Sequence, residues 1–187
     1  AGGVALGAAG LLGGKLGTGG VDGGGGVGGG AQRVVDFGLG IEAAGDELAG
    51  ALGLGGPGDP AMLAYRAHYT SEGWSMNTPF DGIAELLADL RAAGVRLAVA
   101  TSKSEPTAVR ILEHFGFAGF FEVIAGATPD GSRSAKSDVI AHALAQLGPL
   151  PERVLMVGDR SHDVEGAAEH GIDTVVVGWG YGAGDFD

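Results

Sequence analysis

The sequence predicts an α/β protein with a three-layer, Rossmann-like core of parallel strands. Short, almost wholly apolar segments alternate with amphipathic helical segments from residue 61 onward. Apolar segments of this length are typical of strands buried on both faces of a parallel sheet. The connections between the segments are short, so right-handed crossovers would place helices on both faces of a single sheet.

Two helical segments precede the first of these apolar segments. Ala61–Ser71 has apolar residues at helical spacing, and Phe80–Ala93 collects its large aliphatic residues on one face. We expect Gly94 to close the second helix in a left-handed conformation. Val95–Ala100 is apolar except for Arg96 and is therefore predicted to be a buried strand.

The same alternation continues toward the C-terminus. Pro106 suits the first turn of the next helix, and Gly116 and Gly171 each follow a helical segment. The further helices are predicted at Glu105–Phe115, Ser137–Leu147 and Asp163–His170, and the further strands at Phe121–Ala125, Val154–Val157 and Thr174–Val177.

Residues 1–60 differ in composition from the rest of the chain. They hold 24 of the 39 glycines, including seven of the eight residues in 23–30. Such a composition is typical of a flexible linker. Gly-x-Gly-x-x-Gly matches occur within this run, but no apolar strand precedes them and no amphipathic helix follows. They therefore do not indicate a nucleotide site.

The overall composition excludes several classes of function. The 187 residues include no Cys, which excludes disulfides, Cys-based zinc sites and thiol nucleophiles. A net charge of −12 disfavours nucleic-acid binding, because that binding needs clustered Lys and Arg. No stretch of about 20 apolar residues is present to span a membrane, and the first residues lack a basic leader. We therefore expect no membrane partner and a cytoplasmic location.

Polar side chains gather where the predicted strands end, and in a parallel sheet these ends meet at one edge. Thr101 and Ser102 follow one strand, Lys136 begins the helix after the next, and Asp159 and Asp163 follow the third. Hydroxyl and ammonium groups hold phosphate oxygens, and two carboxylates four residues apart can bind a hard cation such as Mg²⁺. This combination predicts phosphoryl-transfer chemistry.

Several of these residues also have a structural interpretation. Thr101 could cap a helix, and Lys136 could be a solvated lysine at a helix start. Asp163 is equally suited to cap the following helix and to bind a metal ion. Ser161-His162-Asp163 contains the residue types of a catalytic triad, but adjacent residues cannot point at one another.

In chain order, these segments resemble the motifs of the haloacid dehalogenase-like hydrolase superfamily, specifically its phosphoglycolate-phosphatase-like branch. The resemblance spans about residues 61–182. It rests on Phe80–Gly82, Val99–Lys103, Lys136, Gly158–Asp163 and Gly178–Gly182. It implies a Mg²⁺-dependent phosphatase that hydrolyses a small phosphomonoester, such as phosphoglycolate, through an aspartyl-phosphate intermediate.

The resemblance also implies a role for each candidate residue. Thr101, with Ser102 beside it, would hold the phosphoryl oxygens, and Lys136 would steady the nucleophile and the phosphate. Asp159 and Asp163 would support Mg²⁺. A helical cap at residues 16–78 would select the substrate, inserted into a core formed by residues 1–15 and 79–187.

The first motif of that family, Asp-x-Asp-Gly-Thr, is absent from the sequence. One cap-length before Phe80, Ala5-Leu6-Gly7-Ala8-Ala9 has the outline of this motif with shorter side chains. Val4 is therefore expected to end a central strand between those that carry Thr101 and Asp159, with Ala5 facing the site. Either residues 1–60 differ from the native ones, or the protein is an inactive relative, because no aspartyl phosphate forms without a carboxylate.

Two other functions stay open. One is a phosphotransferase that passes the phosphoryl group to a protein, because Tyr65–Trp74 and Arg96–Asp130 resemble actinobacterial proteins described as tyrosine kinases. The other is a non-catalytic binding protein, which residues 1–60 as printed would require. The sequence determines neither the substrate nor the oligomeric state.

Overall fold

A single sheet of five parallel strands organises the computed structural model, which describes residues 3–7, 60–75, 78–151 and 153–180. The strands are β1 (Gly3–Gly7), β2 (Val95–Ser104), β3 (Val123–Ala127), β4 (Val154–Gly158) and β5 (Asp173–Val176). The α-helices are α2 (Pro60–Ser71), α3 (Ile83–Ala92), α4 (Glu105–His114), α5 (Lys136–Leu147) and α6 (Ser161–Ala168), and the short 3₁₀ helices are η1 (Gly73–Ser75) and η2 (Ala118–Phe120).

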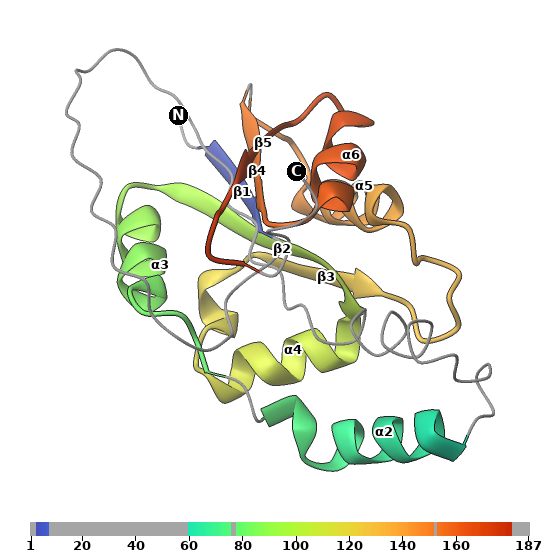
Figure 1. Ribbon diagram of the computed structural model, residues 1–187. Coiled ribbons are helices and arrows are strands. Elements are labelled where there is room, and N and C mark those ends of the chain that lie inside the picture. The colour runs from blue at the N-terminus through green and yellow to red at the C-terminus, as the bar shows by residue number, and fades with distance from the viewer. Residues whose placement is uncertain (1–2, 8–59, 76–77, 152, 181–187) are drawn as a thin grey trace.

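Helices cover both faces of this sheet, whose strand order is β3-β2-β1-β4-β5. Helices α3 and α4 lie on one side, and α5 and α6 lie on the other (Figure 1). The predicted α/β class with a parallel, three-layer core is therefore confirmed. The prediction of a central strand between those that carry Thr101 and Asp159 is also confirmed, because β1 pairs with β2 on one side and β4 on the other. The strand ends at Gly7, however, and not at Val4 as predicted.

Strand β2 is buried on both faces, as its apolar sequence predicts. Residues 97–100 are each at most 1% exposed. The core that encloses them includes Leu87 of α3 and Ile111 of α4 on one side, and Val139 and Ile140 of α5 on the other.

Several element boundaries differ from the predicted ones. Both ends of β3 lie two residues later than predicted. Strand β2 continues through Ser104, so the hydroxyl residues that follow Ala100 lie within the strand and not after it. Helix α3 begins at Ile83 and not at residue 80, because Gly82 before it has a φ of 83° and is not helical. Helix α6 begins at Ser161, two residues before its predicted start.

The predicted helix-ending glycines are confirmed. Gly94, Gly116 and Gly171 have φ angles of 74°, 73° and 68°. Residues with a Cβ rarely adopt this left-handed conformation, so glycine is favoured where a helix must end and turn toward the next strand.

Arg96 ties three segments together at the amino edge of the sheet. Its guanidinium group bonds the Glu122 carboxylate and donates to the carbonyl oxygens of Leu147 and Pro149, at 2.6 and 3.0 Å. The hydrogen bond to Glu122 raises the pKa of Arg96, against a smaller lowering by burial. This polar tie lies at the opposite end of β2 from Thr101.

Helix α2 is attached to the outer side of α4 (Figure 1). Arg110 of α4 donates a 3.1 Å hydrogen bond to the Thr70 carbonyl and stacks its guanidinium 3.7 Å from the centre of the Trp74 ring. The predicted cap at 16–78 includes α2, but most of it lies outside the described residues, as do the glycines at 23–30. None of the helices in the described part of the chain is long and apolar enough to cross a membrane.

Candidate functional site

Thr101 lies at an irregularity of β2. The register between β2 and β3 shifts between Thr101 and Ser104, so β2 carries extra residues at this point. The backbone N–H of Lys103 donates a 3.2 Å hydrogen bond to Thr101 Oγ1. Thr101 and Lys103 are both buried, and Ser102 between them is half-buried. The bulge therefore holds the Thr101 hydroxyl in place.

Lys136, the first residue of α5, extends to the end of β2. Its Nζ donates a 2.9 Å hydrogen bond to the carbonyl oxygen of Ala100, the residue before Thr101. The same atom lies 2.8 Å from Asp163 Oδ1, in an ion pair whose side chains are at most 5% exposed. Gly166 leaves room for this side chain, because a Cβ there would lie 2.8 Å from Lys136 Cγ. Lys136 is therefore not a solvated surface lysine.

Asp163 joins α6 to the end of β4. Its Oδ2 accepts hydrogen bonds from the backbone N–H groups of Asp159, at 3.2 Å, and Arg160, at 3.1 Å. This is the capping role that the sequence left open against metal binding. Within the described residues, the buried Oδ1 accepts no hydrogen bond, although Lys136 pairs with it.

Asp159 is buried directly after β4, beneath the loop that follows β5. A Cβ added to Gly180 of that loop would lie 2.1 Å from Asp159 Oδ2. The backbone at residue 180 therefore approaches the carboxylate as closely as only glycine allows. The backbone at Gly158 approaches Asp163 in the same way, because a Cβ at residue 158 would lie 2.5 Å from Asp163 Cβ.

Four of the five predicted site residues thus form one connected group at the carboxyl edge of the sheet, and the fifth, Ser102, is not part of it. We call Thr101, Lys136, Asp159 and Asp163 the edge cluster. Lys136 and Asp163 link its two halves, since one contacts the backbone beside Thr101 and the other the backbone of Asp159. One ammonium and two carboxylates leave the edge cluster with a net negative charge, which suits a cation more than a bare phosphate.

The donor set of the edge cluster fits Mg²⁺ in part. Mg²⁺ prefers six oxygen ligands, of which proteins commonly supply only one or two carboxylates. Asp159 would supply a carboxylate oxygen, and Asp163 Oδ1 is a second candidate. Across the described residues, no group of three or more His, Asp or Glu side chains forms a complete metal site.

The register of β1 corrects one prediction. Ala5 lies opposite Leu97 of β2 and Leu155 of β4, four residues before Thr101 and Asp159. At about 3.3 Å per residue, this separation is about 13 Å along the strand. Ala5 therefore belongs to the middle of β1 and not to the site. Gly7, the last described residue of the strand, is nearer to the edge, because it lies opposite Val99 and Val157.

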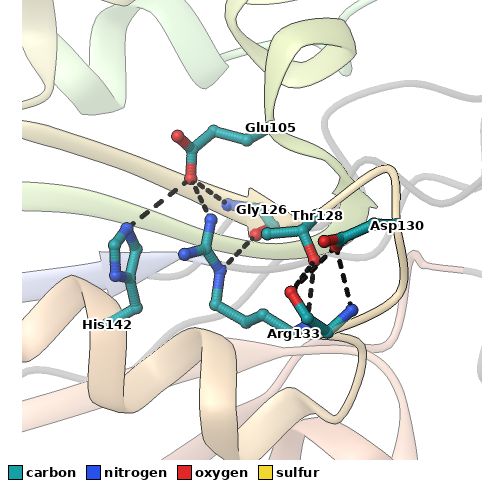
Figure 2. Close-up of polar contacts among 7 residues, drawn as sticks. Glu105, Gly126, Thr128, Asp130, Arg133 and His142 are labelled. Carbon is teal, nitrogen blue, oxygen red and sulfur yellow. Dashed lines mark hydrogen bonds and ion pairs between the residues drawn. The ribbon is translucent and has the colours of Figure 1, made fainter.

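Sequence reasoning missed two further polar groups near this edge. Lys103 Nζ donates a 2.6 Å hydrogen bond to the hydroxyl of Tyr69 in α2. Glu105, the first residue of α4, pairs with Arg133 at 2.7 Å (Figure 2). In each pair the two residues are far apart in the sequence. The available sequence signal was a charged side chain, such as Lys103 or Glu105, in a polar segment.

Comparison with known proteins identifies the family. The model of the haloacid dehalogenase-like hydrolase family matches residues 51–177. The chain belongs to this family. Its branch-level resemblance is also supported, because phosphoglycolate phosphatases are among the haloacid dehalogenase-like relatives. One from Aquifex aeolicus is 31% identical over 117 residues, covering 63% of this chain and 55% of the relative.

Two other relatives in the family are more similar. The tyrosine-protein kinase PtkA of Mycobacterium tuberculosis is 72% identical over 136 residues, covering 73% of this chain and 47% of that protein. A 5'-nucleotidase of Pseudomonas aeruginosa is 42% identical over 125 residues, covering 67% of this chain and 57% of the relative. The chain thus matches about half the length of these curated relatives.

Solved structures of the family share the fold. The structure of Mycobacterium tuberculosis PtkA superimposes with a TM-score of 0.67 at 70% identity, covering 75% of this chain and 65% of that one. A predicted phosphatase from Clostridium acetobutylicum gives a TM-score of 0.66 at 33% identity, covering 74% and 64%. Both support a haloacid dehalogenase-like core for the described residues.

Proposed function

We propose that the edge cluster is the phosphate- and metal-binding half of a Mg²⁺-dependent phosphomonoesterase site. The observation that carries this proposal is the buried Lys136, which contacts the backbone beside Thr101 and pairs with Asp163. An ammonium in this position would neutralise phosphate oxygens next to the Thr101 hydroxyl. Membership of a hydrolase family whose relatives include phosphatases supports the same conclusion.

Each residue of the edge cluster has a distinct proposed role. Thr101 Oγ1 donates to a phosphoryl oxygen, and Lys136 Nζ neutralises a second one. Asp159, with Asp163 Oδ1, holds Mg²⁺, which would neutralise charge on the phosphate when bound. Asp163 also orients Asp159 through its backbone N–H. Ser102 remains a proposed neighbour of the phosphate.

Covalent turnover requires a carboxylate that the printed sequence does not supply at the end of β1. In the proposed reaction, a carboxylate oxygen attacks phosphorus, the ester P–O bond breaks, and the alcohol leaves with a proton from a general acid. Water then attacks phosphorus and gives its proton to the same acid, now a base. The P–O bond to the carboxylate breaks, which releases inorganic phosphate and restores the carboxylate. Gly7 lies opposite Val99 and Val157, two residues before Thr101 and Asp159, so we propose positions 7 and 9 for these two acids. With Gly7 and Ala9 there, we propose binding without turnover.

The substrate of the proposed phosphatase is a small phosphomonoester of the phosphoglycolate class. We expect a cytoplasmic location for the protein, and residues 16–78 are the proposed helical cap that selects the substrate. A second candidate activity is phosphoryl transfer to a protein tyrosine. The high identity to PtkA of Mycobacterium tuberculosis favours it. Stable ATP binding would distinguish this candidate from a phosphatase.

Calorimetric titration with inorganic phosphate and Mg²⁺ tests the proposal. The folded chain should bind phosphate, and Thr101→Val should weaken the binding about tenfold, the cost of one charged hydrogen bond. A double variant, Gly7→Asp with Ala9→Asp, should then hydrolyse p-nitrophenyl phosphate in the presence of Mg²⁺, while the parent chain does not. A parent chain that is folded and binds no phosphate would contradict the proposal, and tight binding of ATP would favour the tyrosine kinase.

A further inference from the structure

A second group of polar contacts lies beside the edge cluster. Glu105 Oε2 accepts a 2.7 Å hydrogen bond from Arg133 Nη2 and a 3.3 Å hydrogen bond from the backbone N–H of Gly126. Arg133 Nε in turn donates to the Gly126 carbonyl oxygen at 2.9 Å. Figure 2 shows the Glu105 carboxylate joined to both Arg133 and His142, and His142 Nε2 lies 3.9 Å from the same carboxylate oxygen. Arg133 and Glu105 thus bind both backbone groups of Gly126.

This pair lies where the β2–β3 ladder is interrupted. Thr101 is in register with Gly126, but Ala127 is in register with Ser104, so the ladder skips residues 102 and 103. The backbones approach closely here, because a Cβ on Gly126 would lie 2.5 Å from the Lys103 carbonyl oxygen and 2.6 Å from the Glu105 nitrogen. Glu105 therefore accepts the Gly126 N–H beside a bulge, where regular strand pairing ends.

The loop from β3 to α5 is held together up to Arg133. The backbone N–H of Thr128 donates to the Arg133 carbonyl oxygen at 3.0 Å. In return, the backbone N–H of Arg133 donates to the Thr128 hydroxyl oxygen at 2.9 Å. Asp130 Oδ1 accepts hydrogen bonds from the N–H and hydroxyl of Ser132. Arg133 is thus the point at which a closed loop is attached to Glu105, three residues before Lys136 (Figure 2).

Two ties therefore connect the same pair of segments. Lys136 bonds the Ala100 carbonyl on the buried side, and Arg133 bonds Glu105 on the side nearer to solvent. The first tie belongs to the edge cluster, and the second does not touch it. A lysine side chain is a flexible four-carbon stem. Its ammonium therefore holds one position only when the backbone that carries it is fixed.

We propose that Glu105 and Arg133 are positioning residues, which set Lys136 against the Thr101 end of β2. Neither residue contacts the phosphate. They fix the start of α5 relative to the bulge, and Lys136 then reaches the Ala100 carbonyl and Asp163 without reorganisation when an anion binds. This proposal deepens the proposed function and rests on it for its consequence in phosphate affinity.

The test uses two independent measurements on the full chain. The first is calorimetric titration with inorganic phosphate in the presence of Mg²⁺. The second is acetylation of lysines by an amine-reactive anhydride, followed by mass spectrometry. The chain contains three lysines, Lys15, Lys103 and Lys136, so the reactivity of Lys136 can be read separately.

Glu105→Ala should weaken phosphate binding roughly tenfold, as expected for loss of a charged hydrogen bond, and should raise the acetylation rate of Lys136 several-fold. Arg133→Ala should do the same. The double variant should show the same tenfold loss and not a hundredfold one, because both changes break one tie. Arg133→Lys keeps the charge but cannot bond Glu105 and Gly126 together, so it should give an intermediate loss.

The matched control is Glu122→Ala. Glu122 is also a partly exposed carboxylate bonded to an arginine, but it lies at the opposite edge of the sheet. This variant should lose stability and leave phosphate affinity and Lys136 acetylation unchanged. If Glu122→Ala lowers phosphate affinity as much as Glu105→Ala does, the loss of affinity follows from a general loss of stability. The positioning role is then overturned.

The remaining outcomes separate the two proposals. If both variants at Glu105 and Arg133 fold, and both measurements stay at parent values, the positioning role is overturned while the proposed function stands. If no form of the chain binds phosphate, but Lys136 acetylation rises in Glu105→Ala, the proposed function fails and the positional tie between Arg133 and Lys136 is supported.

Discussion

Lys103 Nζ lies 2.6 Å from the hydroxyl oxygen of Tyr69 and 4.9 Å from the centre of its ring. Both residues are buried, and they come from different parts of the fold, the β2 bulge and helix α2. Because the Lys103 backbone N–H also bonds Thr101 Oγ1, a single residue connects α2 to the edge cluster. The position of α2 and the position of the Thr101 hydroxyl are therefore linked.

Tyr69→Phe should destabilise the chain, because it removes the oxygen that accepts the Lys103 hydrogen bond while keeping the ring. The expected loss is about 1–2 kcal/mol in the free energy of unfolding, measured by urea denaturation. Ser71→Ala is the control, since the Ser71 hydroxyl donates to a nearby carbonyl in the same helix, that of His68. Equal stability of Tyr69→Phe and the parent would show that this hydrogen bond does not contribute.

Asp163→Ala should be far more destabilising than Asp163→Asn. The alanine leaves the buried Lys136 without its ion-pair partner and the backbone N–H groups of Asp159 and Arg160 without an acceptor. Breaking a buried ion pair costs about 3–5 kcal/mol. Asparagine retains an oxygen for the two N–H groups and should cost less. Combining Asp163→Ala with Lys136→Met should recover part of the loss, and strict additivity of the two changes would contradict the ion pair.

Gly180→Ala should disturb Asp159, whereas Gly178→Ala should not. A Cβ at residue 180 would overlap the Asp159 carboxylate, while a Cβ at residue 178 meets no atom within 4 Å. If Asp159 holds Mg²⁺, the first variant should lower Mg²⁺ affinity roughly ten- to hundredfold. Titration of both variants with Mg²⁺ in the presence of phosphate provides the measurement. Identical affinities would mean that Asp159 is not part of the metal site.

The Asp130 carboxyl group should stay ionised to unusually low pH. Hydrogen bonds from Thr128, and then from the backbone and hydroxyl of Ser132, lower its pKa from 3.8 to about 2. A lowered pKa means that the ionised form stabilises the loop above pH 3.8, and that this contribution is lost as the pH falls through about 2. The ¹³C shift of the carboxyl group should report this midpoint. Thr128→Val should move it upward, and an unchanged midpoint would refute the assigned cause.

The sequence was sufficient to predict the parallel core, because strands buried on both faces are continuous apolar segments. A strand such as β2 must be apolar at every position from Leu97 to Ala100, and a helix such as α5 must repeat apolar residues along one face. The order of the motifs then predicted which polar residues would meet. Lys136 and Asp163 do meet, 2.8 Å apart, although 26 residues separate them in the sequence.

The features that escaped prediction depend on contacts between distant segments. The second half of β2 is polar, so its strand character was hidden until its pairing with β3 was known. The Glu105–Arg133 pair spans 28 residues and has no local pattern. In β1, small residues do not show where the strand meets the site. Counting back from Phe80 placed the acid motif at Ala5 and Gly7, two residues before the positions 7 and 9 proposed above.

The central place of β1 also affects how the chain folds. Gly3 pairs with Val95, and Val4 pairs with Val154, so the middle of the sheet is closed by contacts between residues very far apart in the sequence. Such contacts close large loops and slow folding. Until β1 is inserted, β2 and β4 each carry an unpaired inner edge, and such edges pair readily with other chains. A chain whose residues from 60 onward have already formed their helices and strands is therefore still two half-sheets, exposed to aggregation until residues 3–7 join them.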